Sequence, residues 1–226
     1  MTKIKSWWRF ETGDLKKRIH YYSRVRMALF LAALAGFFVS VFWLWLKSSS
    51  PQISFFDRMA MKFINCFDFP FLKSFLSLIT HLGSSFFIGS AFLILALILV
   101  IKRRKRAAAV SLLSLLGSSL FIYLLKDFFD RPRPFSCLGD DCLSFPSGHT
   151  TLAFYFYGLF FYLVWRFIPL SKKQLKCFGL SIGTLIFLIA LSRVFLGYHY
   201  PSDVLAGFFL GGSWLILAIL LIDFLY

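Results

Sequence analysis

The chain has 226 residues, of which 59% are hydrophobic and 20% aromatic, and it carries a formal net charge of +15. Soluble domains are about half apolar, with short apolar runs, whereas several runs here approach the roughly 20 residues that cross a bilayer. These features exclude a soluble globular protein and indicate one integral membrane domain.

The basic residues gather at the ends of the apolar runs. They form the segments KKR (16–18), KRRKR (102–106) and SKKQLK (171–176). Clusters of this kind orient a membrane protein and attract anionic headgroups. The lipid bilayer is therefore an expected partner, and nucleic acid is not.

The apolar runs predict an all-α fold, a six-helix transmembrane bundle. A basic cytoplasmic segment, 1–26, precedes the first span, and residues 27–226 form a single membrane domain. The first span follows this long basic segment, which indicates an uncleaved anchor. Residues 47–83 predict two short interfacial helices, broken near Pro70. The six spans are expected at 27–46, 84–101, 107–125, 150–168, 177–195 and 204–225.

The distribution of Lys and Arg predicts that both termini are cytoplasmic. With this orientation most basic residues face the cytoplasm and most acidic residues face the outside. In a bacterium, the membrane that the chain is expected to span is the inner (cytoplasmic) membrane. With this orientation three polar clusters lie together at the outer surface. The orientation was not chosen to bring them together, because it rests mainly on the basic segments of the opposite side.

The first cluster is KDFFDRPRP, residues 126–134, at the outer end of the third predicted span. Lys126, Arg131 and Arg133 are cations that suit an anionic oxyacid, and the prolines end the helix. Taken alone, the segment also fits a solvated basic loop or a snorkelling lysine.

The second cluster is SFPSGHTT, residues 144–151, at the start of the fourth predicted span. Ser147 and Gly148 predict a tight turn with free N–H groups, which is an anion site at a helix N-terminus. His149 is suited to delivering a proton to a leaving oxygen. The alternative is a simple helix cap.

The third cluster is SRVFLGYHYPSD, residues 192–203, between the last two spans. Arg193 ends one helix, and Asp203 follows His199 by four residues. A carboxylate on one imidazole nitrogen leaves the other as a nucleophile. The alternative is an interfacial arginine with a structural His–Asp hydrogen bond.

Together the clusters predict a phosphate-transfer site without a metal. Cations outnumber acids there, which disfavours a carboxylate metal site. The expected members are Lys126, Arg133, Arg193, His149, His199 and Asp203.

The order and spacing of these motifs resemble the three-part signature of the type 2 phosphatidic acid phosphatase superfamily, in its bacterial membrane branch. The pattern consists of Lys126-x6-Arg133-Pro134, then Pro146-Ser147-Gly148-His149, then Ser192-Arg193-x5-His199-x3-Asp203.

The resemblance implies a role for each matched residue. His199 would attack phosphorus and form a phosphohistidine, Asp203 would orient it, and His149 would protonate the leaving group. The phosphoryl oxygens would be bound by Lys126, Arg133 and Arg193 and by N–H groups near Ser147 and Gly148. Ser192 would support the site, and Arg131, outside the signature, would bind substrate or serve structure. No cofactor is expected.

The expected substrate is a membrane lipid phosphate, with undecaprenyl pyrophosphate first. Phosphatidylglycerophosphate and lipid A phosphates are alternatives, as is a lipid phosphotransferase that differs only in its acceptor. A non-catalytic lipid-binding protein on the same fold is the alternative from another class. The sequence makes no prediction of oligomeric state.

Two cysteines, Cys137 and Cys142, lie between the first two clusters. A disulfide there would close a small loop beside the site in an oxidising compartment, and two free thiols are the alternative.

Overall fold

The computed structural model describes residues 27–28, 31–32, 34–35, 38–39, 55–66, 69–134 and 142–225. Residues 1–26 and most of the predicted first span therefore lie outside the described part, although the described residues between 27 and 39 are helical. Within this part the chain is helical and forms no strand. Its elements are α2 (Phe55–Asn65), α3 (Pro70–Thr80), the 3-10 helix η2 (His81–Gly83), α4 (Ser85–Ile101), α5 (Lys105–Phe129), α6 (Gly148–Phe167), α7 (Lys172–Phe195) and α8 (Pro201–Leu225).

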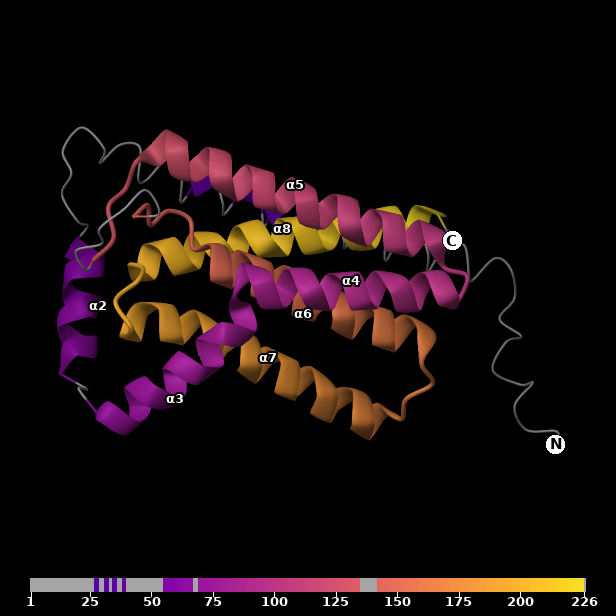
Figure 1. Ribbon diagram of the computed structural model, residues 1–226, viewed down its shortest axis with the longest axis horizontal. Coiled ribbons are helices and arrows are strands. Elements are labelled where there is room, and N and C mark those ends of the chain that lie inside the picture. The colour runs from indigo at the N-terminus through magenta and orange to yellow at the C-terminus, as the bar shows by residue number, and fades with distance from the viewer. Residues whose placement is uncertain are drawn as a thin grey trace.

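The five long helices form a bundle along the longest axis of the molecule (Figure 1). Helix α6 lies in its centre and contacts α4, α5, α7 and α8. Helix α2 crosses one end of the bundle, and α3 slants from there to η2 and α4. The prediction of two short helices with a break near Pro70 is confirmed, since α3 begins at that residue.

The central helix α6 has polar groups that its neighbours satisfy. Tyr155 donates its hydroxyl to the carbonyl of Ser111 on α5 at 3.1 Å, and Tyr157 donates to the carbonyl of Leu82 at 3.0 Å. A buried tyrosine normally finds such a partner. Because other helices surround α6, it can carry tyrosines where a lipid-facing helix would carry aliphatic residues.

The predicted count of six spans is not confirmed. Three described helices, α5, α7 and α8, are long and apolar enough to cross a membrane, and α3–η2 with α4 makes a fourth if this pair, bent by 44°, is one span. The hydroxyl groups of α6 lower its hydropathy, and much of the first predicted span is not described.

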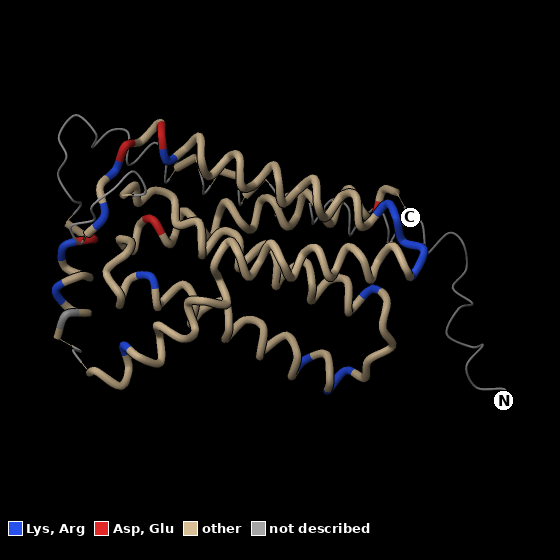
Figure 2. The backbone as a smooth tube through the Cα atoms, viewed as in Figure 1, with Lys and Arg blue, Asp and Glu red and all other residues tan. Residues whose placement is uncertain are grey.

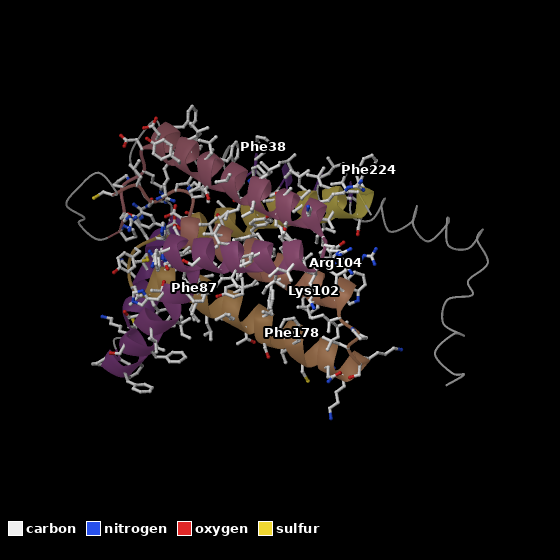
Figure 3. All side chains as sticks on the ribbon, turned by 45° about the vertical axis from the view of Figure 1, so that its right-hand side comes forward. Phe38, Phe87, Lys102, Arg104, Phe178 and Phe224 are labelled. Carbon is white, nitrogen blue, oxygen red and sulfur yellow. The ribbon has the colours of Figure 1, made fainter. Side chains whose placement is uncertain are left out.

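The lipid-facing character of the bundle is clear from its exposed aromatic residues. Figure 3 shows Phe38 and Phe224 projecting from the bundle, and they are 56% and 86% exposed. Surfaces of this kind are unfavourable in water over such an area. The chain is therefore an integral membrane protein, as the composition predicted.

The long helices extend beyond the predicted spans at the site end. Helix α5 continues to Phe129, α6 begins at Gly148 and α8 begins at Pro201. Hydropathy finds only the apolar part of a helix, whereas the backbone stays helical through the polar turns at its ends. These turns carry Lys126, His149 and Asp203.

The charges divide between the two ends of the bundle (Figure 2). The basic segment 102–106 lies at one end of α5, and Lys126 and Arg131 lie at the other. A 25-residue helix is about 37 Å long. The two groups are therefore separated by about the thickness of a membrane core.

Helices α6 and α8 approach closely through two glycines. A Cβ built on Gly211 would lie 2.6 Å from the carbonyl oxygen of Thr151, and one on Gly207 would lie 3.0 Å from that of Ser147. Small residues four apart allow helices in membranes to pack in this way. The contact brings the starts of α6 and α8 together.

Candidate active site

Four helices and two connecting turns bring the predicted site residues to one end of the bundle, next to α2 (Figure 1). Lys126 is in the last turn of α5, His149 in the first turn of α6 and Arg193 in the last turn of α7. Electrostatic interactions join His149 to four members of the set, which are Arg193, His199, Arg133 and Lys126. The convergence expected from the three clusters is therefore present.

The ring of His199 is held by the backbone. Its Nδ1 lies 2.7 Å from the carbonyl oxygen of Ser144, and the side chain is only 2% exposed. A carbonyl oxygen can only accept, so Nδ1 carries the proton. The other nitrogen, Nε2, consequently has the lone pair that a nucleophile requires.

Asp203 does not make the hydrogen bond to His199 that the four-residue spacing led us to expect. The distance from His199 Nδ1 to Asp203 Oδ2 is 3.7 Å, which is too long for a hydrogen bond. That oxygen instead accepts the N–H of Tyr200 at 2.8 Å, and the other oxygen is paired with Arg131. Asp203 therefore lies beside the imidazole as a charge, while Ser144 fixes the tautomer.

The pKa of His199 is lowered below its ordinary value of 6.5. Burial is the main cause, because it disfavours the charged imidazolium. Asp203 opposes this effect and raises the pKa, whereas the cations Arg193 and Lys126 act in the same direction as burial. The neutral form of the ring is thus favoured.

The three predicted cations are fixed by different contacts. Lys126 donates to the carbonyl of Leu143 at 2.6 Å, and Arg193 donates from Nη1 to Thr80 Oγ1 at 2.9 Å. The guanidinium of Arg193 also lies 4.4 Å from the centre of the Tyr198 ring, and that of Arg133 lies 6.0 Å from it.

Two guanidinium donors at the site are buried without an acceptor. Among the described residues, Nε of Arg133 and Nε of Arg193 have no hydrogen-bond partner. A buried donor on a charged group is costly to leave unsatisfied. Two such donors at the same end of the bundle as His149 and His199 favour an anionic ligand with several oxygens.

The N-terminus of α6 is partly occupied by its own cap, contrary to the expectation of a free turn. The N–H of Ser147 donates to the carbonyl of Asp203 at 3.1 Å, and its hydroxyl caps the N–H of Thr150. Ser147 is fully buried, so its side chain serves the helix. Gly148 and His149 are the first two helical residues, whose N–H groups have no partner inside a helix.

Ser192 and Gly83 pack next to the site through contacts with Ile189. The Ser192 hydroxyl donates to the carbonyl of Ile189 at 2.6 Å and is fully buried. A Cβ on Gly83 would lie 2.5 Å from Ile189 Cγ2 and 3.5 Å from His149 Cδ2. The η2 segment can pass this close to His149 because glycine has no side chain.

Arg131 forms a network that the sequence motifs did not reveal. It pairs with Asp203 and, at 2.8 Å, with Asp57 of α2, and its guanidinium lies 4.4 Å from the ring centre of Tyr200. Of the two roles considered for Arg131, these contacts favour the structural one. No motif marks Asp57, because it lies in the segment 47–83, which also contains Asp68 and predicts only interfacial helices.

Two further contributors were also missed. Ser144 acts through its carbonyl, which has no signature in a sequence. Thr80 contacts Arg193 from a position 113 residues earlier, and no local pattern marks it.

Only one of the two cysteines of the predicted disulfide, Cys142, lies among the described residues. Cys142 is disulfide-bonded, and Cys66 and Cys177 are free thiols. Cys137, its predicted partner, lies outside the described residues.

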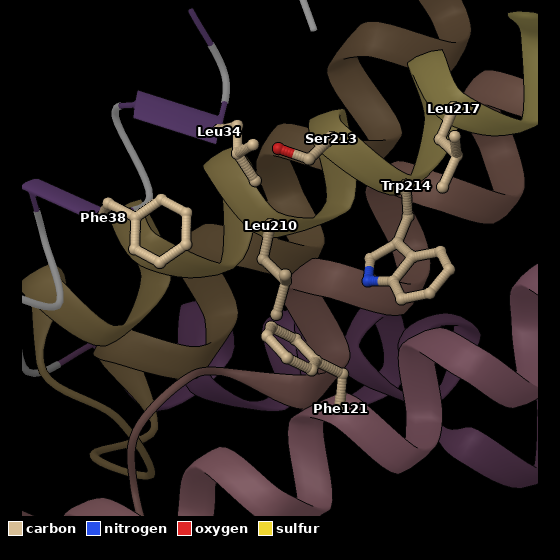
Figure 4. Close-up of a pocket in the computed structure, with 7 residues that line it drawn as sticks. All are labelled: Leu34, Phe38, Phe121, Leu210, Ser213, Trp214 and Leu217. Carbon is tan, nitrogen blue, oxygen red and sulfur yellow. The ribbon is translucent and has the colours of Figure 1, made fainter. Parts of the chain in front are cut away.

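An apolar cavity of about 150 Å³ lies away from the site, between α5, α8 and the helical residues near the N-terminus (Figure 4). Its lining contains none of the predicted site residues. The lining residues are Leu34, Phe38, Phe121, Leu210, Ser213, Trp214 and Leu217.

Among the described residues, no three His, Cys, Asp or Glu side chains form a group that would hold a metal ion. The positive charge near the two histidines is supplied by Lys126, Arg133 and Arg193 instead. The donor set of the site itself thus suits an anion better than a cation.

A helical membrane bundle with these cations and histidines at one end defines a membrane-embedded phosphatase. The chain belongs to the PAP2 superfamily, whose family model matches residues 107–225. This match includes all three motifs and confirms the resemblance found in the sequence. The chain is thus a membrane lipid phosphatase of the PAP2 family and a phosphoric ester hydrolase.

Known relatives agree with this assignment. Phosphatidylglycerophosphatase B of Bacillus subtilis (strain 168) is 33% identical over 144 residues, which cover 63% of this chain and 71% of the relative. The crystal structure of a transmembrane PAP2-type phosphatidylglycerolphosphate phosphatase from Bacillus subtilis has a TM-score of 0.69 at 28% identity, covering 86% of this chain and 94% of its own. Aquifex aeolicus LpxE has a TM-score of 0.54 at 25% identity, covering 71% and 93%.

Proposed function

We propose that this phosphatase removes the terminal phosphate of a membrane lipid through a phosphohistidine on His199. The proposal is carried by two features of this end of the bundle. Arg133 and Arg193 each have a buried Nε donor without a partner, and both act electrostatically on His149, as does His199. The ring of His199 donates through Nδ1 and so keeps a lone pair on Nε2. Phosphoryl transfer requires mainly positioning and charge stabilisation, and this end of the bundle offers both.

In the first step, Nε2 of His199 attacks phosphorus. A P–N bond forms while the bond from phosphorus to the leaving oxygen breaks, and protonated His149 gives its proton to that oxygen, which belongs to a lipid alcohol or to a lipid monophosphate. Arg133, Arg193 and Lys126 bind the phosphoryl oxygens, together with the N–H groups of Gly148 and His149. Asp203 stabilises the positive charge that develops on the imidazole.

In the second step, a water molecule attacks phosphorus and the P–N bond breaks. The water gives a proton to His149, which restores the starting state, and inorganic phosphate leaves. A lipid alcohol in place of water would make the enzyme a phosphotransferase. The fate of a labelled phosphate, in inorganic phosphate or in lipid, separates these reactions.

The orientation is part of the proposal. We place the basic segment 102–106 in the cytoplasm and the site at the outer face of a bacterial inner membrane, with both termini inside. A lipid can then keep its tail in the bilayer while its phosphate reaches the site. Labelling of single-cysteine variants at exposed positions of each end, from either side of the membrane, tests this orientation.

Two substrates are proposed for separate reasons. Undecaprenyl pyrophosphate is proposed from the family resemblance and the proposed orientation, because recycling of this carrier needs a phosphatase facing outward. Phosphatidylglycerophosphate is favoured by the names of the two relatives from Bacillus subtilis. Both present a terminal phosphate on a lipid.

The test is a panel of purified lipid phosphates in mixed liposomes, with release of inorganic phosphate as the measurement. The full-length wild-type protein is compared with His199→Gln, which retains a polar side chain without the nucleophile. We expect one lipid to be turned over by the wild type alone. Equal turnover by both proteins, or none by the wild type on any lipid, would overturn the proposal.

A further inference from the structure

Helix α2 turns one of its faces toward the catalytic end of the bundle. Asp57 is fully buried on this face, and Met61 and Ile64 pack on residues of α7 and α8. The spacing of four and three residues places them on one stripe of the helix. The other side carries Phe55, Phe56, Met59 and Phe63, all of them exposed. Figure 1 shows α2 crossing the end of the bundle where α8 begins.

Contacts of Asp57 with Ser202 and Arg131 join α2 to the bundle, and both of these residues lie next to the site. Oδ1 of Asp57 accepts the N–H of Ser202 at 3.0 Å, and its Oδ2 accepts the Ser202 hydroxyl at 2.7 Å. Oδ2 also pairs with Arg131 Nη2 at 2.8 Å. A carboxylate at a helix N-terminus is favourable because the helix dipole is positive there. Asp57 thus binds both the start of α8 and Arg131.

Arg131 uses its other nitrogen on Asp203 and on the same serine. Nη1 donates to an oxygen of Asp203 and, at 2.8 Å, to the Ser202 hydroxyl. The planar guanidinium can bridge two carboxylates in this way, whereas an ammonium cannot present two donors in a fixed plane. Its position is fixed further by the ring of Tyr200.

We propose that Asp57 is a positioning residue: through Arg131 it holds the carboxylate of Asp203 at its place beside His199. This inference rests on the proposed function of His199. Helix α2 lies outside residues 107–225 of the family match. By this inference it nevertheless contributes, through Arg131 and Asp203, to the reaction at His199.

The charges give this role a measurable consequence. Asp57 and Asp203 together carry two negative charges against the single positive charge of Arg131. Without Asp57, the positive charge of Arg131 is shared with no carboxylate other than Asp203. The negative potential at His199 therefore becomes weaker. The imidazolium is then less stable, so the acid limb of kcat/KM moves to lower pH. The other charged or titratable groups that face His199 are Lys126 of α5, His149 of α6 and Arg193 of α7.

The experiment compares Asp57→Asn with the full-length wild type on the lipid that the wild type turns over. We expect kcat to fall about tenfold or more, because a misplaced catalytic group is costly, while KM changes little. We also expect the acid limb to shift to lower pH. Asp57→Glu keeps the charge, and it should keep the limb in place and restore part of kcat. Asp127→Asn is the control, since it makes the same change at an exposed residue near this end.

A wild-type kcat and pH profile for Asp57→Asn would overturn the inference while leaving the proposed function intact. A loss of kcat with an unmoved limb and a lowered unfolding temperature would also overturn it, because a merely structural acid gives that result. If Asp57→Asn does not fold, Arg131→Lys decides. It retains the cation without the bridging fork, so a tenfold lower kcat at unchanged KM is expected, and a wild-type kcat refutes the role. Inactivity of the wild type on every lipid would instead refute the proposed function.

Discussion

The backbone N–H of Ser147 donates to the backbone carbonyl of Asp203 at 3.1 Å. This bond joins the residue before α6 to the first turn of α8, and thereby holds the two proposed catalytic histidines at neighbouring helix ends. The glycines of α8 allow the approach, because the two helices meet at Gly207 and Gly211.

We expect Gly211→Ala to lower the free energy of unfolding by about 1–3 kcal/mol. The added Cβ would lie 2.6 Å from a backbone carbonyl oxygen, which cannot move without displacing α6. Thermal unfolding of the purified protein measures the effect. Gly183→Ala in α7 is the matched control, since its Cβ meets nothing within 4 Å and alanine favours a helix. Equal stability of both variants would contradict the close packing.

His149→Ala should lower turnover of a lipid phosphate by about 10²–10⁴-fold if this residue protonates the leaving oxygen. The same variant should lose much less activity on a p-nitrophenyl phosphate ester, because that leaving group departs without a proton. The ratio of the two losses is the measurement. Equal losses on both substrates would assign His149 to phosphate binding instead.

The acid limb of kcat/KM should lie below pH 6.5. Nucleophilic attack needs the neutral ring of His199, and burial lowers the pKa of this residue from 6.5. The ring therefore stays neutral as the pH falls through 6.5, where an unperturbed histidine would become protonated. A pH profile under kcat/KM conditions tests this, and a limb above 6.5 would contradict it.

Thr80→Val should raise KM by about tenfold or more, with a smaller change in kcat. The variant removes the hydroxyl that accepts from Arg193 Nη1 at 2.9 Å, and a hydrogen bond to a charged group is worth about 1.5–3 kcal/mol when it must be replaced. Steady-state kinetics give the two constants. Thr80→Ser retains the hydroxyl and should behave as the wild type.

Chelation should leave the activity unchanged. Lys126, Arg133 and Arg193 supply the positive charge near the proposed nucleophile, so the proposed reaction has no step that needs a metal ion. Phosphate release is measured after incubation with EDTA and removal of the chelator. A loss of activity that Mg²⁺ or Zn²⁺ restores would refute the metal-free mechanism.

The sequence predicted the helical elements near the site because their apolar runs are long and their polar ends are distinct. It also identified His149, His199 and the three cations, since these stand in spaced motifs. It could not find Asp57 or Thr80, because their contacts depend on how α2 and η2 cross the end of the bundle. It predicted Asp203 as the partner of one imidazole nitrogen of His199, since sequence spacing cannot show that the carbonyl of Ser144 lies nearer to that ring.

The prediction of six spans is not confirmed, although α6 occupies the predicted span 150–168, because α6 is too polar to be a candidate span by length and composition. Helix α6 carries tyrosines that bond to Ser111 and Leu82 inside the bundle, and a single sequence does not reveal which helix is central. The bend between η2 and α4 likewise depends on packing against α6 and α7.

The hydrogen bond from His199 to the carbonyl of Ser144 has a consequence for variation in this chain. No replacement of the residue 144 side chain can delete the acceptor, since every amino acid brings the same carbonyl. The orientation of the proposed nucleophile therefore does not depend on the chemistry of the side chain at that position. It depends instead on the path of the backbone, which the hydrogen bond from Ser144 N–H to the Arg131 carbonyl helps to fix. Insertions or deletions between the first two motifs should accordingly damage the enzyme more than substitutions at residue 144.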